Sequence, residues 1–304
     1  MGTESTGNDI LDQYRNISNK LKKRFLRKPN VTEACESFTS LGQHCETVEM
    51  PSYAGLCWIA AARCEGSLGN IPGEAACLVR SARQFVEAED RNDRLNCPSP
   101  SSENLQAALN CYAHAASRYP ENCPFIAGLN LEIAETLKRR GKSACSESYL
   151  RAVCDISDHA YDTKLFSLQR LCYHYIDEGD YCSALEGFNE MSNLIVKGPS
   201  CDINCDLLLD CEICRLFLVL ILRPAPQSLS PDLAQLLEKY TWGDNKNISA
   251  SRMSAKLFLL LQSVVLTCQS GDTSGLSALE DELWACDQLN AKQKDLLRVL
   301  VEAM

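Results

Sequence analysis

The sequence lacks any long apolar run and any apolar N-terminal core. Its longest apolar stretch, Leu216 to Leu222, is far shorter than the roughly 18 residues that a membrane-spanning helix needs. The first ten residues, MGTESTGNDI, are polar and acidic, which excludes a secretory signal in this segment. We therefore expect a cytoplasmic protein, with nuclear entry as an additional role.

The recognised catalytic motifs are also missing. There is no G-x-x-x-x-G-K-S/T, no G-x-G-x-x-G, no H-E-x-x-H and no G-x-S-x-G. The four histidines are scattered, and Cys172 and His174, which are only two residues apart, would face different sides of a helix. We expect no enzyme, no cofactor and no catalytic or metal-binding residue.

Cysteine, by contrast, is abundant, with 18 residues. In a reducing compartment thiols serve as small buried apolar side chains or as metal ligands. Cys201, Cys205, Cys211 and Cys214 form the one cluster, but its five-residue connection is shorter than the roughly 15–20 residues that usually separate two zinc knuckles. A zinc site stays open as an alternative, while helix packing is the favoured interpretation.

Apolar residues recur at helical spacing, and no alternating strand pattern is present. The clearest unit runs from Lys164 to Met191, where Gly179-Asp180-Tyr181 separates two apolar helical patterns. Weaker copies are centred on Gly141 and Gly69. The spacing brackets loosely the period of about 34 residues that is typical of tetratricopeptide repeats.

These patterns predict an all-α, tetratricopeptide-like α-solenoid of antiparallel helix pairs with atypical capping helices. We expect one domain over residues 1–304, a disordered tail over residues 1–7 and a short inter-helix link over residues 198–200. Asn30 is placed to cap a helix that starts at Val31. Further helices are predicted over Ile10–Phe25, Asn104–Tyr119, Cys205–Leu222, Pro231–Tyr240, Ser254–Gln269, Gly275–Ala285 and Ala291–Ala303.

Positive charge is concentrated near the N-terminus. Residues 1–28 carry seven basic and three acidic side chains, a net charge of +4, whereas the rest of the chain carries 23 and 37, a net charge of −14. Three uses stay open for Lys20 to Lys28: a nuclear import signal, a membrane-surface helix aided by myristoylation of Gly2, and docking onto an acidic partner. Nucleic-acid binding is not expected, because it needs a broader positive field and the rest of the chain is acidic. A solvated face on a capping helix is the plain alternative.

Several blocks of sequence lie outside any generic repeat. They are Tyr14-Arg15, Ser18 to Val31, Pro72 to Ala75, Ala82-Arg83 with Phe85, Cys97-Pro98, Cys211-Glu212 with Arg215, Leu237 to Tyr240 with Trp242, and Leu257 to Ser263. In this order the blocks resemble the 40-kDa huntingtin-associated protein family, also called factor VIII intron 22 proteins. Mammalian members have a long proline-rich insertion before the Cys211 helix, where this chain has only Gly198-Pro199-Ser200.

The resemblance implies a non-catalytic partner that binds and stabilises huntingtin, a large HEAT-repeat scaffold, and that is linked to early endosome traffic through the small GTPase Rab5. It implies a heteromer rather than a homo-oligomer. A vesicle adaptor similar to the soluble attachment proteins of membrane fusion, acting without huntingtin, is the alternative, followed by a peptide-clamping cochaperone. The residues we expect to contact the partner are Lys20, Lys22, Lys23, Arg24, Arg27, Lys28, Glu238, Lys239, Tyr240 and Trp242.

Overall fold

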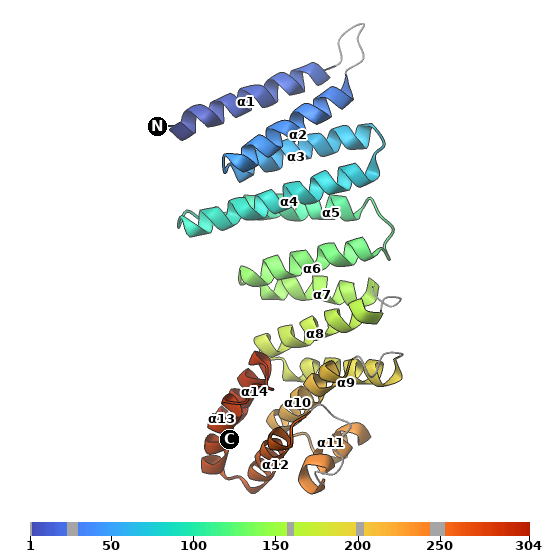
Figure 1. Cartoon of the computed structure of the whole chain (residues 1–304), viewed down its shortest axis with the longest axis vertical. Coiled ribbons are helices and arrows are strands. Elements are labelled where there is room, and N and C mark those ends of the chain that lie inside the picture. The colour runs from blue at the N-terminus through green and yellow to red at the C-terminus, as the bar shows by residue number, and fades with distance from the viewer. Residues whose placement is uncertain (1, 23–29, 157–160, 199–203, 244–252) are drawn as a thin grey trace. The chain divides into compact units, whose positions relative to one another are not determined.

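The computed structural model describes residues 2–22, 30–156, 161–198, 204–243 and 253–304, with side chains from Asp9 onward. Within these ranges the chain forms 14 α-helices, one short 3-10 helix and no strand, which confirms the all-α prediction (Figure 1). The described residues group into two compact units, residues 1–142 and 143–304. The expectation of one domain over residues 1–304 stays a prediction, and each unit is described by itself.

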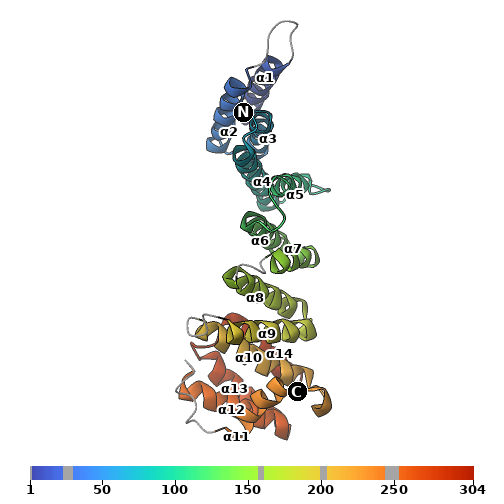
Figure 2. The same ribbon diagram turned by 90° about the vertical axis from the view of Figure 1, so that its right-hand side faces the viewer.

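The first unit holds six helices that stack in chain order (Figure 2). They are α1 (Gly2–Leu21), α2 (Val31–Thr47), α3 (Pro51–Ser67), α4 (Ile71–Arg94), α5 (Glu103–Ala116) and α6 (Pro124–Arg139). Helix α1 begins at Gly2, so it extends into residues 1–7, which were expected to be a tail. Once the turns after Asp9 are formed, each further residue adds one backbone hydrogen bond, which favours this extension.

The second unit holds the remaining helices, and α14 returns to pack on α10 and to touch α8. They are α7 (Ser143–Ile156), α8 (Tyr161–Glu178), α9 (Tyr181–Lys197), α10 (Cys205–Leu222), the 3-10 helix η2 (Pro226–Ser228), α11 (Pro231–Trp242), α12 (Ala255–Ser270), α13 (Thr273–Trp284) and α14 (Ala291–Glu302). Every predicted helix is present, with ends that differ by a few residues apart from α1. Of the predicted link over residues 198–200, only Gly198 lies inside the described residues.

Small residues let neighbouring helices approach closely, as the repeat pattern predicts. In the first unit Gly55 of α3 faces the ring of Phe85 of α4, and a Cβ atom at Gly55 would lie 2.8 Å from that ring. In the second unit Gly187 of α9 faces the thiol of Cys172 of α8, where a Cβ atom would lie 2.6 Å from the sulfur. Both distances are shorter than van der Waals contact, so a larger residue would push the helices apart.

The turn between α8 and α9 shows how one residue serves two helices. Gly179 has a φ of +77°, a left-handed conformation that glycine adopts without steric cost. The next residue, Asp180, donates its backbone N–H to the carbonyl of Tyr175 at 2.9 Å, which closes α8. Its side chain accepts the backbone N–H of Ser183 at 3.1 Å, which opens α9. Gly69 with Asn70, and Gly271 with Asp272, make the same double cap.

Candidate partner-binding surface

The N-terminal helix closes the end of the first unit. Its apolar stripe begins at Ile10, which is 1% exposed, and continues through Tyr14, whose ring centroid lies 5.2 Å from that of Phe38 on α2. Ile17 and Leu21 pack against the same core. Asn30 caps α2 by accepting the backbone N–H of Glu33 at 3.2 Å, as predicted. The described part of the stripe therefore packs inside the protein, and Arg15 and Lys20 are exposed on this helix together with the acidic Asp9 and Asp12.

Of the six basic residues predicted to bind the partner, the structure describes two. Lys20 is exposed and its Nζ lies 3.7 Å from a carboxylate oxygen of Glu33, and Lys22 is exposed directly after α1. The other four lie outside the described residues: Lys23, Arg24, Arg27 and Lys28. An exposed lysine with one loose ion pair contributes little to the stability of the protein, so Lys20 is available to another molecule.

In the C-terminal block the structure separates residues that the sequence analysis grouped together. Trp242, at the end of α11, is 84% exposed, and Glu238 is exposed as well. The Nζ of Lys239 lies 2.6 Å from a carboxylate oxygen of Glu212 on α10, so this lysine is already part of an ion pair inside the unit. Among these residues Trp242 has the form of a binding anchor, since a large exposed aromatic ring is the most frequent kind of interface hot spot.

Tyr240 is a correction to the predicted surface. Its side chain is 0% exposed, its ring stacks on Phe258 with centroids 5.2 Å apart, and its hydroxyl donates to Glu212. It cannot meet a partner while the helix stays packed. Leu233, Leu236 and Tyr240 recur three and four residues apart along α11 and are the buried face of that helix. This spacing was readable in the sequence.

Helix α12 carries an apolar face that the predicted site residues omit. Its core side includes Phe258, Leu261 and Val265, yet Leu259 is 48% exposed and Leu266 is 46% exposed on the opposite side. These two leucines are seven residues apart and therefore share one face of the helix. Their seven-residue spacing is the signal that could have identified them.

The ends of α11 and α12 lie next to each other. The side-chain amide of Gln269 contacts the hydroxyl of Thr241 at 3.4 Å, so the last turn of α12 meets the residue that precedes Trp242. Trp242, Leu259 and Leu266 are together called the C-terminal apolar surface below. Exposed apolar groups collected on neighbouring elements are typical of a protein-binding surface.

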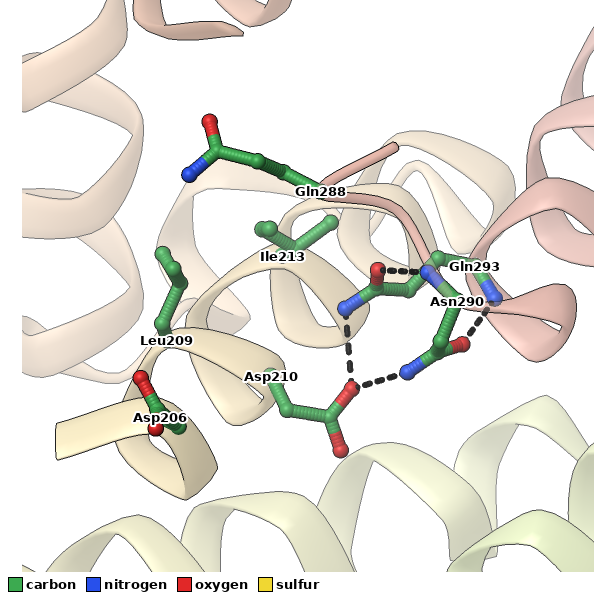
Figure 3. A pocket seen from close by; sticks show the side chains of 7 residues that line it. All are labelled: Asp206, Leu209, Asp210, Ile213, Gln288, Asn290 and Gln293. Carbon is green, nitrogen blue, oxygen red and sulfur yellow. Dashed lines mark hydrogen bonds between the residues drawn. The ribbon is translucent and has the colours of Figure 1, made fainter. Parts of the chain in front are cut away.

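The same unit contains a polar cavity of about 270 Å³, and the polar side chains at its centre already hydrogen-bond to one another. The cavity lies between α10 and the start of α14, and Asp210, which is 9% exposed, is its central charge (Figure 3). The carboxylate of Asp210 accepts hydrogen bonds from Asn290 at 2.6 Å and Gln293 at 2.8 Å. It also accepts one from Tyr173 at 2.7 Å and one from Gln169 at 3.1 Å, both on α8. With four donors supplied from within, this carboxylate holds three helices together.

The described cysteines of the Cys201–Cys214 cluster support the interpretation that they pack between helices. Cys211 and Cys214 are both 0% exposed in α10, and burial raises the pKa of each thiol well above its ordinary value. Cys205 is half-buried, whereas Cys201 lies outside the described residues. Across the described ranges no group of three or more His, Cys, Asp or Glu residues is arranged to hold a metal ion.

Two further possibilities, a catalytic Cys172–His174 pair and a membrane-spanning helix, do not fit the described residues. Cys172 is fully buried and burial raises the pKa of its thiol, which is the opposite of what a nucleophilic cysteine needs. His174, two residues on, is 1% exposed. No helix in the described part of the chain combines the length and apolarity required to cross a bilayer.

Comparison with known proteins adds the family. No protein-family model matches the chain. The "40-kDa huntingtin-associated protein" of Mus musculus and that of Rattus norvegicus are each 32% identical to it over 360 aligned residues, covering 98% of this chain and 93% of the relative. Two solved structures of a putative kinesin light chain with nearly identical TPR-like repeats, from Podosopora anserina, are also similar. Each has 15% identity and a TM-score of 0.36, over 67% of this chain and 92% or 91% of theirs.

The match covers 98% of this chain and therefore includes both units. Identity at this level over nearly the full length of both chains identifies a common family. The chain belongs to the 40-kDa huntingtin-associated protein family.

Proposed function

We propose that this chain is a non-catalytic structural partner that binds and stabilises the HEAT-repeat scaffold of huntingtin. The observation that carries the proposal is the family relationship, because relatives that match 98% of this chain are named for their association with huntingtin. The helical architecture supports it, since stacked helix pairs offer long binding faces to a large partner. The internal saturation of Asp210 and the burial of Cys172 support a role without catalysis.

In this proposal the C-terminal apolar surface is one point of contact. Trp242 has the largest exposed fraction of the large apolar side chains in the described part of the protein, and burying it would remove an aromatic ring from water. Leu259 and Leu266 extend the apolar area along α12. The basic segment Lys20 to Lys28 is a second contact, which would meet acidic side chains of the partner.

The test is co-purification of the full-length chain with the huntingtin of the same organism. Trp242→Ala is expected to weaken the complex by about 2 kcal/mol or more, close to a 30-fold rise in Kd. Trp284→Ala is the matched control, because Trp284 is also exposed, at 41%, but its ring is covered by the guanidinium of Arg298 at 4.8 Å. Thermal unfolding of each isolated variant separates lost binding from lost folding.

Failure of the wild-type chain to bind huntingtin would contradict the function itself. If Trp242→Ala bound huntingtin as tightly as wild type while Trp284→Ala bound it more weakly, huntingtin would still be the partner, but the contact would lie on another face of the protein. Retention of the chain on SNARE proteins in the absence of huntingtin would support the attachment-protein alternative instead.

We further propose that the complex acts in the cytoplasm on early endosomes, together with Rab5, and that the free chain can enter the nucleus. The link to Rab5 and endosomes follows from the family resemblance, and the nuclear role from the basic segment Lys20 to Lys28. Imaging the tagged chain in cells with and without huntingtin tests both parts. Loss of overlap with Rab5-positive vesicles when huntingtin is removed is the expected result, and overlap that does not change would contradict it.

A further inference from the structure

Ser99 and Ser230 are the serines of the chain that are followed directly by proline, and no threonine is. A proline in this position is what proline-directed protein kinases, such as mitogen-activated and cyclin-dependent kinases, require of a substrate. Because the two dipeptides are alike in sequence, their surroundings decide whether a kinase can reach the hydroxyl group. Ser99 lies in the first unit and Ser230 in the second, and the structure gives them opposite surroundings.

Ser99 is closed to a kinase. It lies in the connection between α4 and α5, and its hydroxyl oxygen is buried. Its carbonyl oxygen accepts the backbone N–H of Ser102 at 3.1 Å, which folds the segment into a tight turn around Pro100. Since the hydroxyl has to meet the phosphate of ATP, Ser99 cannot react while this turn stays folded.

Ser230 is open. It is exposed at the N-cap of α11, and its hydroxyl makes no capping hydrogen bond to that helix. Its backbone has a φ of −65° and a ψ of 152°, and Leu229 before it has a φ of −72° and a ψ of 129°. Both residues are therefore extended, as expected before a proline, and an extended chain is the form in which kinases bind the residues around a phosphorylated serine.

The residues after Ser230 are accessible as well. Pro231 and Asp232 are exposed, and Leu233 is the first buried residue of α11. The carbonyl of Ser230 accepts the backbone N–H of Ala234 at 3.0 Å, which closes the first turn of the helix. Helix ends open locally at small cost, so a kinase can bind Pro231 and Asp232 without unfolding the rest of the unit.

We propose that Ser230 is a phosphorylation site for a proline-directed protein kinase. The hydroxyl oxygen of Ser230 attacks the γ-phosphorus of ATP held by the kinase, and the bond from that phosphorus to the bridging oxygen of ADP breaks. The hydroxyl proton passes to the carboxylate base of the kinase, which leaves phosphoserine and ADP as the products. The inference does not rest on huntingtin binding.

The phosphate group would stand at the N-terminus of α11. The backbone N–H groups of Asp232 and Leu233 belong to the first turn, where a helix supplies no acceptor of its own, and the Ser230 side chain does not cap them. A phosphate, with a charge of about −1.5 to −2 at pH 7, accepts such bonds and is favoured by the helix dipole. The carboxylate of Asp232 repels it, but Asp232 is exposed and solvent screens this repulsion.

The experiment is phosphorylation of the folded full-length chain by an active mitogen-activated protein kinase with Mg²⁺ and ATP, followed by peptide mass spectrometry. Ser230 is expected to react about 10-fold faster than Ser99 or more, because a closed site reacts only in the molecules that have opened. Synthetic peptides of residues 94–105 and 225–236 lack the fold, and both should react. Ser230→Ala should remove the modification and Pro231→Ala should slow it about as strongly, whereas Ser99→Ala should leave it unchanged.

Hydrogen exchange of the phosphorylated chain measures the second part of the proposal, and the first turns of α11 should exchange several-fold more slowly than before modification. The proposal is wrong if the kinase modifies the 225–236 peptide but not Ser230 in the folded chain, or if Ser99 reacts as fast as Ser230. A cyclin-dependent kinase repeats the test where the first kinase modifies neither peptide, and failure of both kinases on the 225–236 peptide would also overturn it. Unchanged or faster exchange along α11 would contradict the capping of this helix by the phosphate.

Discussion

At the scale of single residues, Asp210 is a buried carboxylate of the second unit whose stability depends on its neighbours. A buried carboxylate without a cation is stable only when several donors surround it. Here two donors come from α8 and two from the start of α14, the latter drawn in Figure 3. Burial, and after it the negative charge of Asp210, raise the pKa of Tyr173, so this phenol stays protonated and continues to donate. The cluster therefore fixes the position of α14 through specific geometry rather than through apolar contact alone.

Asp210→Asn tests that role. The amide nitrogen of asparagine is a donor, and it would face the donors that now point at the carboxylate, leaving at least one buried donor unsatisfied. We expect a loss of about 2–4 kcal/mol in the free energy of unfolding, together with faster hydrogen exchange along α14. Urea unfolding and hydrogen-exchange mass spectrometry measure the two effects.

The matched control is Asp287→Asn, an identical change at an exposed position between α13 and α14. Its effect should stay within about 0.5 kcal/mol. If the two variants lost equal stability, or if α14 kept its protection in Asp210→Asn, the cluster would not be what holds this helix.

At the scale of the elements, the tight turns that join paired helices are the recurring feature of the repeats. In the turns at Gly69, Gly179 and Gly271 the glycine adopts a left-handed conformation, and the polar residue after it caps both helices. Gly179→Ala places a Cβ atom in that conformation, and we expect it to destabilise the protein by about 1–2 kcal/mol. Urea unfolding of the full-length chain is the measurement.

The same glycine-to-alanine substitution at Gly128 is expected to change the free energy of unfolding in the opposite direction. Gly128 lies inside α6, and a Cβ atom there would meet nothing within 4 Å. Gly128→Ala should therefore stabilise the protein by roughly 0.5–1 kcal/mol, because alanine loses less backbone freedom on folding and favours the helix. If both variants shifted the unfolding free energy in the same direction, turn conformation would not be the cause.

The elements are also where the sequence was most informative. Apolar spacing and the Gly179-Asp180 pair predicted the helices and their turn, because both are local properties. Tyr240 was assigned to the surface since the family resemblance grouped it with Trp242, although its spacing from Leu236 placed it inside. The cluster around Asp210 was out of reach, because its hydrogen bonds join residues 37 to 83 positions apart and their pairing depends on tertiary packing.

At the scale of the whole molecule, charge is distributed unevenly along the chain. Residues 1–28 have a net charge of +4 in a protein of net charge −10. In the proposed complex the basic segment would guide association, because long-range attraction raises the rate of encounter more than the final affinity.

This distribution predicts that association with huntingtin slows as salt increases from about 50 to 300 mM, since the Debye length then falls from about 14 to 6 Å. A variant with Lys22, Lys23 and Arg24 replaced by glutamine should associate about 3- to 10-fold more slowly at low salt and respond less to added salt. Stopped-flow or surface plasmon resonance measurements would determine both rates. If this variant associated at the wild-type rate and with the wild-type salt response, the basic segment would not contribute to the contact with huntingtin.

The double caps at Asn70, Asp180 and Asp272 have a consequence for how this family varies in length. Because a single residue ends one helix and starts the next, an insertion or deletion at such a turn disrupts two helices at once. The alignment to the rodent relatives spans 360 positions against a chain of 304 residues, so the family does tolerate large insertions. Selection should confine those indels to the longer connections and keep the tight turns at constant length throughout evolution.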